Sequence, residues 1–423
     1  MKGVKTKMLH KSGITLLLLL ALFASVAPAR ADATSYRLAV LPPEHKLMKD
    51  PITGVDLLFV SASSAKDHNL YFHQRSWISD DSMVLFRSDR PGGKLMGYLF
   101  ATGELVCLTT PAGALLCPTA AWEGNRVYAY RPPDIVEIAL TIEPSADVTK
   151  APSTVTATER VICTLPAGTG LNAGLTENRD GTLLGLDLSR PDGQWVAVAD
   201  VRSGEVRYVC QFTFAGHLQF SITNPNLMSV AGTKDRLVVI DLSQGGQPRI
   251  LHHQVEGEFV THECWWINDS LTFCGGYRDK ESHVKVIDVH TGEVRIVGAG
   301  AWVPWAESGD DVLNRWNWWH AAGHESGRWI VADNWYGDVV VFDGETTQMH
   351  RLTLGHRRYG GGLHPEPGWD RGGRRVVFTS EMLGGSHVCV ATIPDEWRPD
   401  PADEGLIITG GAIKSELPAA QAD

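Results

Sequence analysis

The stretch HQRSWISDDSMVLFRSDRPGGKLMGYLFATGELVCLT, residues 73–109, contains one structural unit of this chain. It runs from a histidine through an aromatic residue and an Asp-rich turn to an apolar strand, a loop, a further strand and a Thr-Gly-Glu turn. The stretch HECWWINDSLTFCGGYRDKESHVKVIDVHTGEVRIV, residues 262–297, has the same features in the same order and over a similar length. Short apolar runs bounded by Gly, Asp, Asn or Ser are typical of β strands.

The unit recurs along the chain. Successive histidines that open such units, at positions 217, 262, 320 and 364, lie 45, 58 and 44 residues apart. A four-stranded propeller blade takes roughly 40–50 residues, so the spacing predicts an all-β, seven-bladed β-propeller with an insertion around residues 301–319. A β-sandwich is the alternative architecture, but it does not require such regular spacing. The seven units are expected to start near Leu70, Leu116, Leu171, His217, His262, His320 and His364.

Glycine turns mark the outer part of each unit. Thr-Gly-Glu stands at residues 102–104 and 291–293, Ser-Gly-Glu at 203–205 and Asp-Gly-Glu at 343–345. Each is expected to be a tight turn with its glycine at positive φ. The segment 32–69 is expected to add an entry strand to the propeller.

The first 31 residues resemble a bacterial secretory signal. Four lysines precede residue 12, residues 14–26 are apolar, and Ala29-Arg30-Ala31 forms a small-residue cleavage site. A membrane anchor is the alternative, but the apolar run is short for a membrane span. We therefore expect a signal peptide at residues 1–31 and one propeller domain at 32–423, in a periplasmic or secreted protein without stable membrane insertion.

Charge and cysteine content restrict the partners. Removing residues 1–31 takes away five basic residues and no acidic one, which changes the formal charge from −11 to −16. An acidic protein is a poor candidate for nucleic-acid binding, and an anionic substrate must be met by local basic groups. The seven cysteines include no C-x-x-C pair, which argues against a thiolate zinc site. A disulfide between Cys107 and Cys117 is compatible with an oxidising compartment.

The histidines carry the functional signal. Because the first strand of every blade lines the central channel, His73, His217, His262, His320 and His364 are expected to meet there. One histidine in a strand is usually a hydrogen-bonded structural residue, but five at equivalent positions indicate a metal site or a proton-transfer site. Imidazoles with one or two oxygen ligands suit a divalent transition metal.

Four segments carry a family resemblance: residues 217–230 (HLQFSITNPNLMSV), 256–266 (EGEFVTHECWW), 320–333 (HAAGHESGRWIVAD) and 363–380 (LHPEPGWDRGGRRVVFTS). Through them the chain resembles the oligogalacturonate lyase family, seven-bladed propellers that cleave short uronic-acid chains by metal-assisted β-elimination. The resemblance implies that His320 and His364 bind the metal. It also implies that His262 is the base and that Arg236 binds the substrate carboxylate.

Two positions depart from the family pattern. Glu366 stands where the family has a second histidine, and Gly361 stands where it has a glutamine ligand. Glu366 is therefore the expected third ligand, and the mixed nitrogen and oxygen set favours Mn²⁺, with Zn²⁺ or Ca²⁺ as alternatives. Gln74 and Gln219 are candidates to compensate for the changed ligands. Together with His73 and His217, they are also expected to contact the substrate.

The predicted substrate is an acidic oligosaccharide. Its C5 proton is removed by a histidine while the carboxylate charge is stabilised, and a 4,5-unsaturated sugar results. Two alternatives remain from the sequence: a non-catalytic exported scaffold resembling TolB-type propellers, and another propeller enzyme. Tryptophans near the predicted insertion are candidates to stack on sugar rings, namely Trp302, Trp305, Trp316, Trp318, Trp319 and Trp335.

Overall fold

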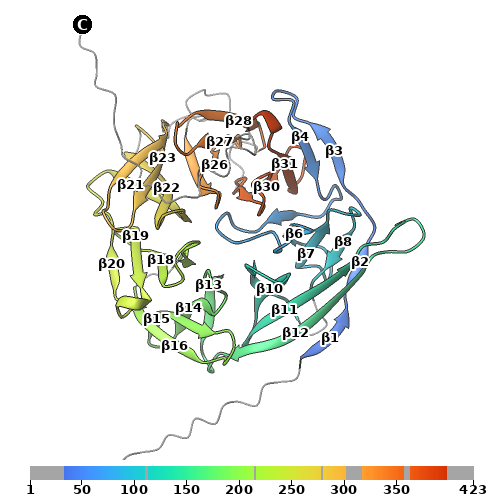
Figure 1. Ribbon diagram of the computed structural model, residues 1–423, viewed down its shortest axis with the longest axis horizontal. Helices are drawn as coiled ribbons and strands as arrows, with labels where there is room; N and C mark the ends of the chain where they lie inside the picture. Colours follow the sequence, from blue (N-terminus) through green and yellow to red (C-terminus); the bar gives the residue numbers. More distant parts are fainter. Residues whose placement is uncertain are drawn as a thin grey trace, which may run out of the picture. The chain divides into compact units, whose positions relative to one another are not determined.

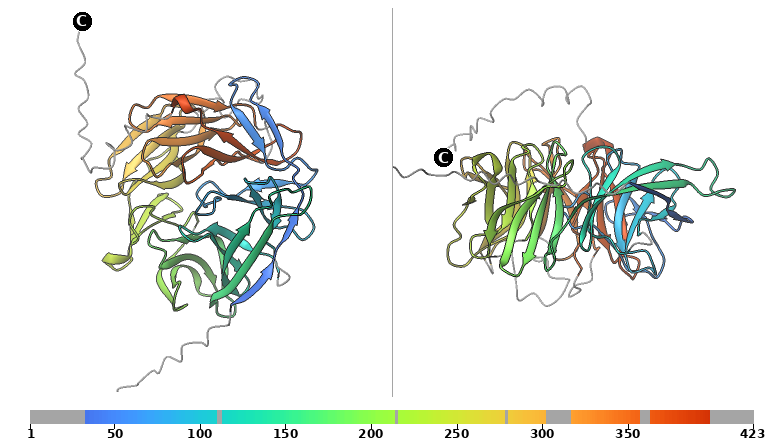
Figure 2. Two further views of the ribbon diagram at one scale, coloured as in Figure 1. Left: turned by 45° about the vertical axis from the view of Figure 1, so that its right-hand side comes forward. Right: turned by 90° about the horizontal axis from the view of Figure 1, so that it is seen from below.

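The chain forms a seven-bladed β-propeller in the computed structural model, which describes residues 33–109, 113–213, 216–277, 280–301, 317–356 and 363–397. The seven antiparallel sheets are arranged around a central axis in Figure 1. Seen edge-on in the right panel of Figure 2, the strands run between the two faces of the ring. The predicted fold class is confirmed.

Within each blade, the strands follow one another along the chain from the innermost strand outward. Blade 1 contains β5 (Asp67–Asn69), β6 (Met83–Ser88), β7 (Leu95–Leu99) and β8 (Leu105–Cys107). Blade 2 contains β9 (Leu116–Ala120), β10 (Arg126–Arg131), β11 (Asp134–Glu143) and β12 (Thr154–Thr164). Blade 3 contains β13 (Gly170–Glu177), β14 (Leu183–Arg190), β15 (Gly193–Asp200) and β16 (Val206–Phe212). Blade 4 contains β17 (Gln219–Phe220), β18 (Leu227–Ala231), β19 (Leu237–Asp241), a 3-10 turn η1 (Leu242–Gln244) and β20 (Pro248–Ile250).

The remaining blades follow the same order. Blade 5 contains β21 (Glu258–Trp266), β22 (Ser270–Tyr277), β23 (His283–Asp288) and β24 (Val294–Gly298). Blade 6 contains β25 (Trp318–Gly323), β26 (Trp329–Asn334), β27 (Val339–Asp343) and β28 (Met349–Thr353). Blade 7 contains β29 (Gly368–Trp369), β30 (Arg375–Ser380) and β31 (His387–Thr392), followed by a 3-10 turn η3 (Asp395–Trp397). The innermost strands thus lie at or close to the seven predicted starts.

The N-terminal segment contributes more than the expected entry strand. β4 (Asp56–Phe59) pairs with β31 and is the outer strand of blade 7, and β3 (Lys46–Lys49) extends that sheet. β1 (Thr34–Arg37) pairs with β12, and β2 (Ala39–Leu41) pairs with β8. The start of the propeller therefore covers the sheet edges of three blades, which removes unpaired edge groups and closes the ring (Figure 1).

The core lies between neighbouring blades. Among the described residues, the buried apolar side chains form seven clusters, and each lies mainly between two adjacent blades. Strand β6 shows the consequence, since Met83, Val84, Leu85 and Phe86 are all fully buried. Both faces of a central strand are covered because blades pack against neighbours on both sides, so the first four residues of β6 are continuously apolar rather than alternating.

The turn predictions are confirmed at three of four places. Gly103, Gly204 and Gly292 adopt φ values of 76°, 78° and 74°. The fourth turn differs: Gly344 is outside the left-handed region, and Thr347 has the positive φ instead, at 64°. Gly344 has another reason to lack a side chain, because a Cβ there would lie 2.5 Å from the Trp266 ring.

Cys107 and Cys117 are both free thiols, so the disulfide that the sequence allowed is not formed. Within the described ranges, no helix is long and apolar enough to cross a membrane. The proposed signal at residues 1–31 lies outside the described residues.

Candidate active site

The five predicted histidines come together at the centre of the ring. The ring centroids of His73 and His217 are 5.3 Å apart, and those of His217 and His262 are 5.7 Å apart. His262 and His320 are separated by 4.0 Å, and His320 and His364 by 5.5 Å. These residues come from blades 1, 4, 5, 6 and 7, so the propeller assembles the cluster from positions nearly 300 residues apart in the sequence.

Local backbone distortion helps to aim these side chains. His217, His262 and Glu366 have φ values of 53°, 53° and 52°, a left-handed conformation that is uncommon for residues other than glycine. The β21–β22 pairing shifts register between Thr261 and Cys264, which places His262 in a bulge. Bulges re-aim side chains and are frequent beside active sites. In blade 7, Glu366 rather than His364 shares the conformation of the two histidines.

Two central aromatic residues were missed in the sequence. The Tyr71 ring lies 5.0 Å from His73, 5.2 Å from His217 and 5.9 Å from His320. The Phe72 ring lies 5.1 Å from His320 and 5.3 Å from His73. Their position directly before His73 could have indicated this, because neighbouring residues in one innermost segment of a blade lie close to the same central axis.

An arginine, a glutamate and a histidine form a network on blades 4 and 5. Arg236 Nε donates to Glu263 Oε2 at 2.8 Å, and Arg236 Nη2 lies 3.0 Å from His217 Nδ1. Glu263 is fully buried, and although burial opposes ionisation, Arg236 and His217 lower its pKa to about 2. Arg236 is thus placed at the cluster as predicted, but one edge of its guanidinium is held by a carboxylate of the protein.

This network defines the tautomer of His217. A guanidinium can only donate hydrogen bonds, so His217 Nδ1 accepts from Arg236 and Nε2 carries the proton. Glu263 Oε1 lies further from Nδ1, at 3.3 Å. His217 Nε2 is 3.1 Å from the Tyr71 hydroxyl, to which it therefore donates. The proton of the Tyr71 hydroxyl is consequently directed to another acceptor. Burial, together with Glu366 and Glu263, raises the pKa of Tyr71, which keeps this hydroxyl protonated.

The tautomer of His262 follows from one backbone contact. Its Nδ1 lies 2.7 Å from the carbonyl oxygen of Trp319, which can only accept, so Nδ1 carries the proton. The lone pair is then on Nε2. Burial and the neighbouring His320, His217 and Arg236 hold the pKa of His262 well below its usual value. Burial and His217 likewise lower the pKa of His73 to about 3.

A buried carboxylate supports the two predicted metal ligands on blades 6 and 7. Asp333, fully buried in β26, lies 3.0 Å from His320 Nδ1 and accepts from the backbone amides of His320 and Glu366 at 2.8 and 2.9 Å. Burial and Asp333 raise the pKa of Glu366 to about 8, against the effect of Arg87. Asp333 was not predicted, and its position in a different strand of blade 6 gave no sequence signal.

The residues fit a divalent cation in two respects. Metal-binding histidines commonly donate their second ring nitrogen to a carboxylate, as His320 does to Asp333. Two imidazoles on one ion at about 2.1 Å place their centroids about 5 Å apart, close to the 5.5 Å of His320 and His364. In the described residues, no group of three His, Cys, Asp or Glu side chains is already arranged at ligand distance.

The two predicted glutamines are engaged within the protein. Gln219 Nε2 donates to the backbone oxygens of Glu263 and His217 at 2.8 and 3.2 Å. Gln74 Oε1 accepts from Arg87 and from the Tyr71 amide, both at 3.3 Å. Both side chains are buried, so their present contacts support the loops that hold the histidines.

The predicted tryptophans divide into two groups. Trp319 and Trp335 lie beside the cluster, with their centroids 6.2 and 5.2 Å from that of His364. Trp318 is buried core and donates to Ala299 O. The other three, Trp302, Trp305 and Trp316, as well as Gly361, lie outside the described residues.

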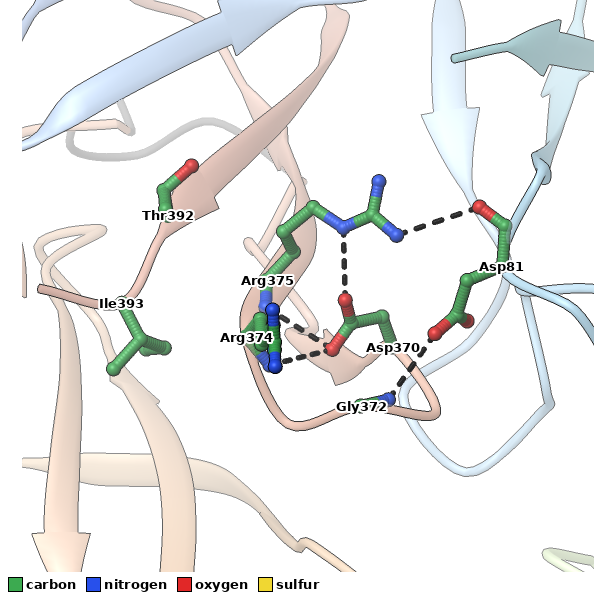
Figure 3. A pocket seen from close by; sticks show the side chains of 7 residues that line it. All are labelled: Asp81, Asp370, Gly372, Arg374, Arg375, Thr392 and Ile393. Atoms are coloured by element: carbon green, nitrogen blue, oxygen red, sulfur yellow. Dashed lines mark hydrogen bonds and ion pairs between the residues drawn. The ribbon is translucent and has the colours of Figure 1, made fainter. Parts of the chain in front are cut away.

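A cavity between the first and last blades lies away from the histidine cluster. The cavity has a volume of about 620 Å³ and is lined by residues that include Asp81, Asp370, Arg374 and Arg375. Figure 3 shows these side chains, which come from blades 7 and 1. Arg375 Nε pairs with Asp370 Oδ2 at 2.8 Å, and Asp81 accepts from the amides of Arg371 and Gly372 at 3.0 and 3.1 Å. These groups join the first and last blades, and we assign the cavity no part in the candidate active site.

Comparisons with known proteins agree with this architecture. No model of a known protein family matches the chain, and no curated protein matches its sequence. An oligogalacturonate lyase in complex with manganese matches with a TM-score of 0.68 and 17% identity, over 86% of this chain and 100% of its own. An oligogalacturonate lyase from Vibrio parahaemolyticus matches with a TM-score of 0.67 at the same identity and coverage. This chain has the fold of the oligogalacturonate lyases. At this identity the likeness establishes the fold, and the chemistry depends on the residues described above.

Proposed function

We propose that this protein is an exported lyase that cleaves uronic-acid-containing oligosaccharides by metal-assisted β-elimination. The observation that carries the proposal is the meeting of five histidines from five blades at one point, with His320 backed by the buried Asp333. A propeller that only binds a partner has no need for this arrangement on its axis.

His262 is the proposed base. Its Nδ1 is held by the Trp319 carbonyl, so the Nε2 lone pair can accept a proton from the sugar C5. The hydrogen bond also fixes the ring orientation, which a base requires for proton transfer. The base acts on C5 and a cation acts on the carboxylate, so two different groups are needed.

The proposed cation would be held by His320, His364 and Glu366. When bound, a divalent ion such as Mn²⁺ supplies a positive charge that stabilises the anion formed when C5 loses its proton. Asp333 orients the His320 ring for this role and fixes its tautomer.

Arg236 and two tryptophans are proposed to hold the substrate. Arg236 uses Nε and Nη2 within the protein, which leaves Nη1 to meet the sugar carboxylate beside His217. Trp319 and Trp335, 4.9 Å apart, offer aromatic faces beside His364 on which a pyranose ring can stack. His73 and His217, with ring centroids 5.3 Å apart in the same cluster, are proposed to add polar contacts to the sugar.

Tyr71 is the proposed donor of a proton to the leaving oxygen. Because His217 Nε2 already donates to the Tyr71 oxygen, the phenol proton points elsewhere and can be delivered to the departing glycosidic oxygen. We expect Tyr71→Phe to slow cleavage of natural uronate oligosaccharides by about 100-fold, within the usual range for loss of an acid catalyst. With an aryl leaving group, which needs no protonation, the same variant should retain nearly wild-type activity in steady-state assays. Equal slowing with both leaving groups would rule out this role.

The function itself is tested with the purified mature protein, which we expect to begin at Asp32. Incubated with Mn²⁺ and a panel of uronate oligosaccharides, it should form the conjugated 4,5-unsaturated product, detected by near-ultraviolet absorbance and by mass. Absence of product from every uronate, with intact binding of the oligosaccharide, would favour a scaffold. Product with added water would instead indicate a hydrolase.

A further inference from the structure

A cluster of arginines lies at the other end of the central channel. The innermost strands begin near the histidines and end in turns on the opposite face, where a narrow cavity of about 110 Å³ includes Arg75, Trp122 and Arg371 in its lining. Phe72 and His73 both line this cavity, and the Phe72 ring also contacts His320, so the cavity adjoins the histidine cluster at these two residues.

Three guanidinium groups surround a single tryptophan there. The Trp122 ring centroid is 4.3 Å from the guanidinium carbon of Arg75, 4.6 Å from that of Arg179 and 4.6 Å from that of Arg371. The four residues come from blades 1, 2, 3 and 7, which are consecutive around the ring. Cation–π attraction stabilises each contact by only about 0.5–1 kcal/mol at exposed sites, and it does not remove the repulsion among three like charges.

The neighbouring carboxylates neutralise only part of this charge. Glu177 pairs with Arg75 at 3.1 Å, and its oxygens also accept from the Trp122 amide at 2.6 Å and the Tyr128 hydroxyl at 3.1 Å. Asp370, also in the cavity lining, is occupied by Arg375 at 2.8 Å.

Two of the three arginines remain without a carboxylate. Among the described residues, Arg179 forms no hydrogen bond or ion pair, and the Arg371 guanidinium forms one long hydrogen bond to Trp122 O at 3.4 Å. The exposed Glu325 also lines the cavity but forms no ion pair with either arginine. Burial, together with Arg371 and Arg179, lowers the pKa of Arg75 to about 10 although Glu177 opposes the shift. The cluster is thus locally cationic in an acidic protein.

We propose that Arg75, Arg179 and Arg371 form a binding site for a small oxyanion at the end of the channel opposite the histidines. Guanidinium groups bind carboxylate and phosphate through paired N–H donors, and Arg179 and Arg371, which both contact the Trp122 ring, provide such donors. The cavity is too small to enclose an oligosaccharide, so the ligand is inorganic phosphate or sulfate, or the carboxylate group of a small organic acid.

The test is calorimetric titration of the full-length mature protein at constant ionic strength, with inorganic phosphate in one arm and galacturonate monosaccharide in the other. We expect saturable binding by the wild type and at least tenfold weaker binding by the double variant Arg179→Gln, Arg371→Gln. The matched control is Arg190→Gln, since Arg190 stacks on Tyr208 at 4.4 Å and pairs with Asp192 on another part of the surface. This control should bind like the wild type.

The arms distinguish the source of the anion. If the double variant loses phosphate binding, the ligand of the arginine site is an inorganic anion. If it loses galacturonate binding, the ligand of that site is a carboxylate. Absence of saturable binding of both anions by the wild type, or equal binding of both anions by the double variant, would overturn the proposal. Unchanged binding of galacturonate alone would assign that sugar to the proposed histidine site and leave phosphate as the arginine ligand. Should the double variant unfold, Arg371→Lys keeps the charge but removes the paired donors, and it should weaken the same binding severalfold. Unchanged binding by this variant would also count against the site.

Discussion

Replacing His262 by Ala is expected to slow β-elimination by about 100- to 10,000-fold, the usual contribution of a general base. The physical reason is that the Nε2 lone pair of His262 is the proposed acceptor for the C5 proton, and no other group is held in that tautomer by the Trp319 carbonyl. The measurement is the initial rate of formation of the unsaturated product at saturating substrate. Metal content should remain near that of the wild type, because His262 is not a proposed ligand.

Two comparisons make this result specific. His290→Ala removes an exposed imidazole that pairs with Asp269 far from the cluster, and it should leave the rate unchanged. Arg236→Ala should mainly raise KM for acidic substrates, because the proposed role of Arg236 is to hold a carboxylate. That variant also leaves the buried Glu263 without its charged partner, so Arg236→Lys is the milder test of the same role. A His262→Ala enzyme that forms product at the wild-type rate would show that the base is another residue.

Much of this fold can be read from the sequence because the propeller is built by repetition. The inner strand, Asp-rich turn and Gly turn recur with a blade-sized spacing, and central strands such as β6 contain a continuous apolar run, Met83 to Phe86. The pairing of β1, β2, β3 and β4 with three separate blades could not be predicted in this way. Those pairings join residues far apart in the sequence, and the short N-terminal strands carry no repeat that indicates their partners.

The site was predictable to the extent that it follows from topology. The histidines meet because equivalent inner-strand positions face one axis, and that rule needs only their place in each repeat. The hydrogen bonds that decide chemistry are different. Asp333 reaches His320 from the next strand of its blade, and Glu263 reaches Arg236 from the neighbouring blade. The same limit explains Gln219, whose amide is held by backbone oxygens rather than being presented to the channel.

Replacing His320 by Ala is expected to abolish stoichiometric metal binding. His320 is fully enclosed, and its Nδ1 lies 3.0 Å from both carboxylate oxygens of Asp333, an arrangement that directs Nε2 to a ligand. Without this imidazole, His364 and Glu366 would offer only two of the three proposed protein ligands. Elemental analysis after dialysis against Mn²⁺ measures the result directly and does not depend on activity.

Asp333→Asn tests whether the Asp333 carboxylate orients His320 for metal binding. The amide keeps the size of the side chain but removes its charge, so His320 should lose part of its orientation and Mn²⁺ affinity should fall by about 10- to 100-fold. Thermal unfolding of the metal-free variants checks that both remain folded. His262→Ala is the matched control, since it removes a neighbouring imidazole 4.0 Å from His320 and should retain the metal. Stoichiometric metal in His320→Ala would show that His320 is not a required ligand. Loss of metal in His262→Ala alone would show that the residue assigned as the base binds the ion, which would exchange the proposed roles of these two histidines.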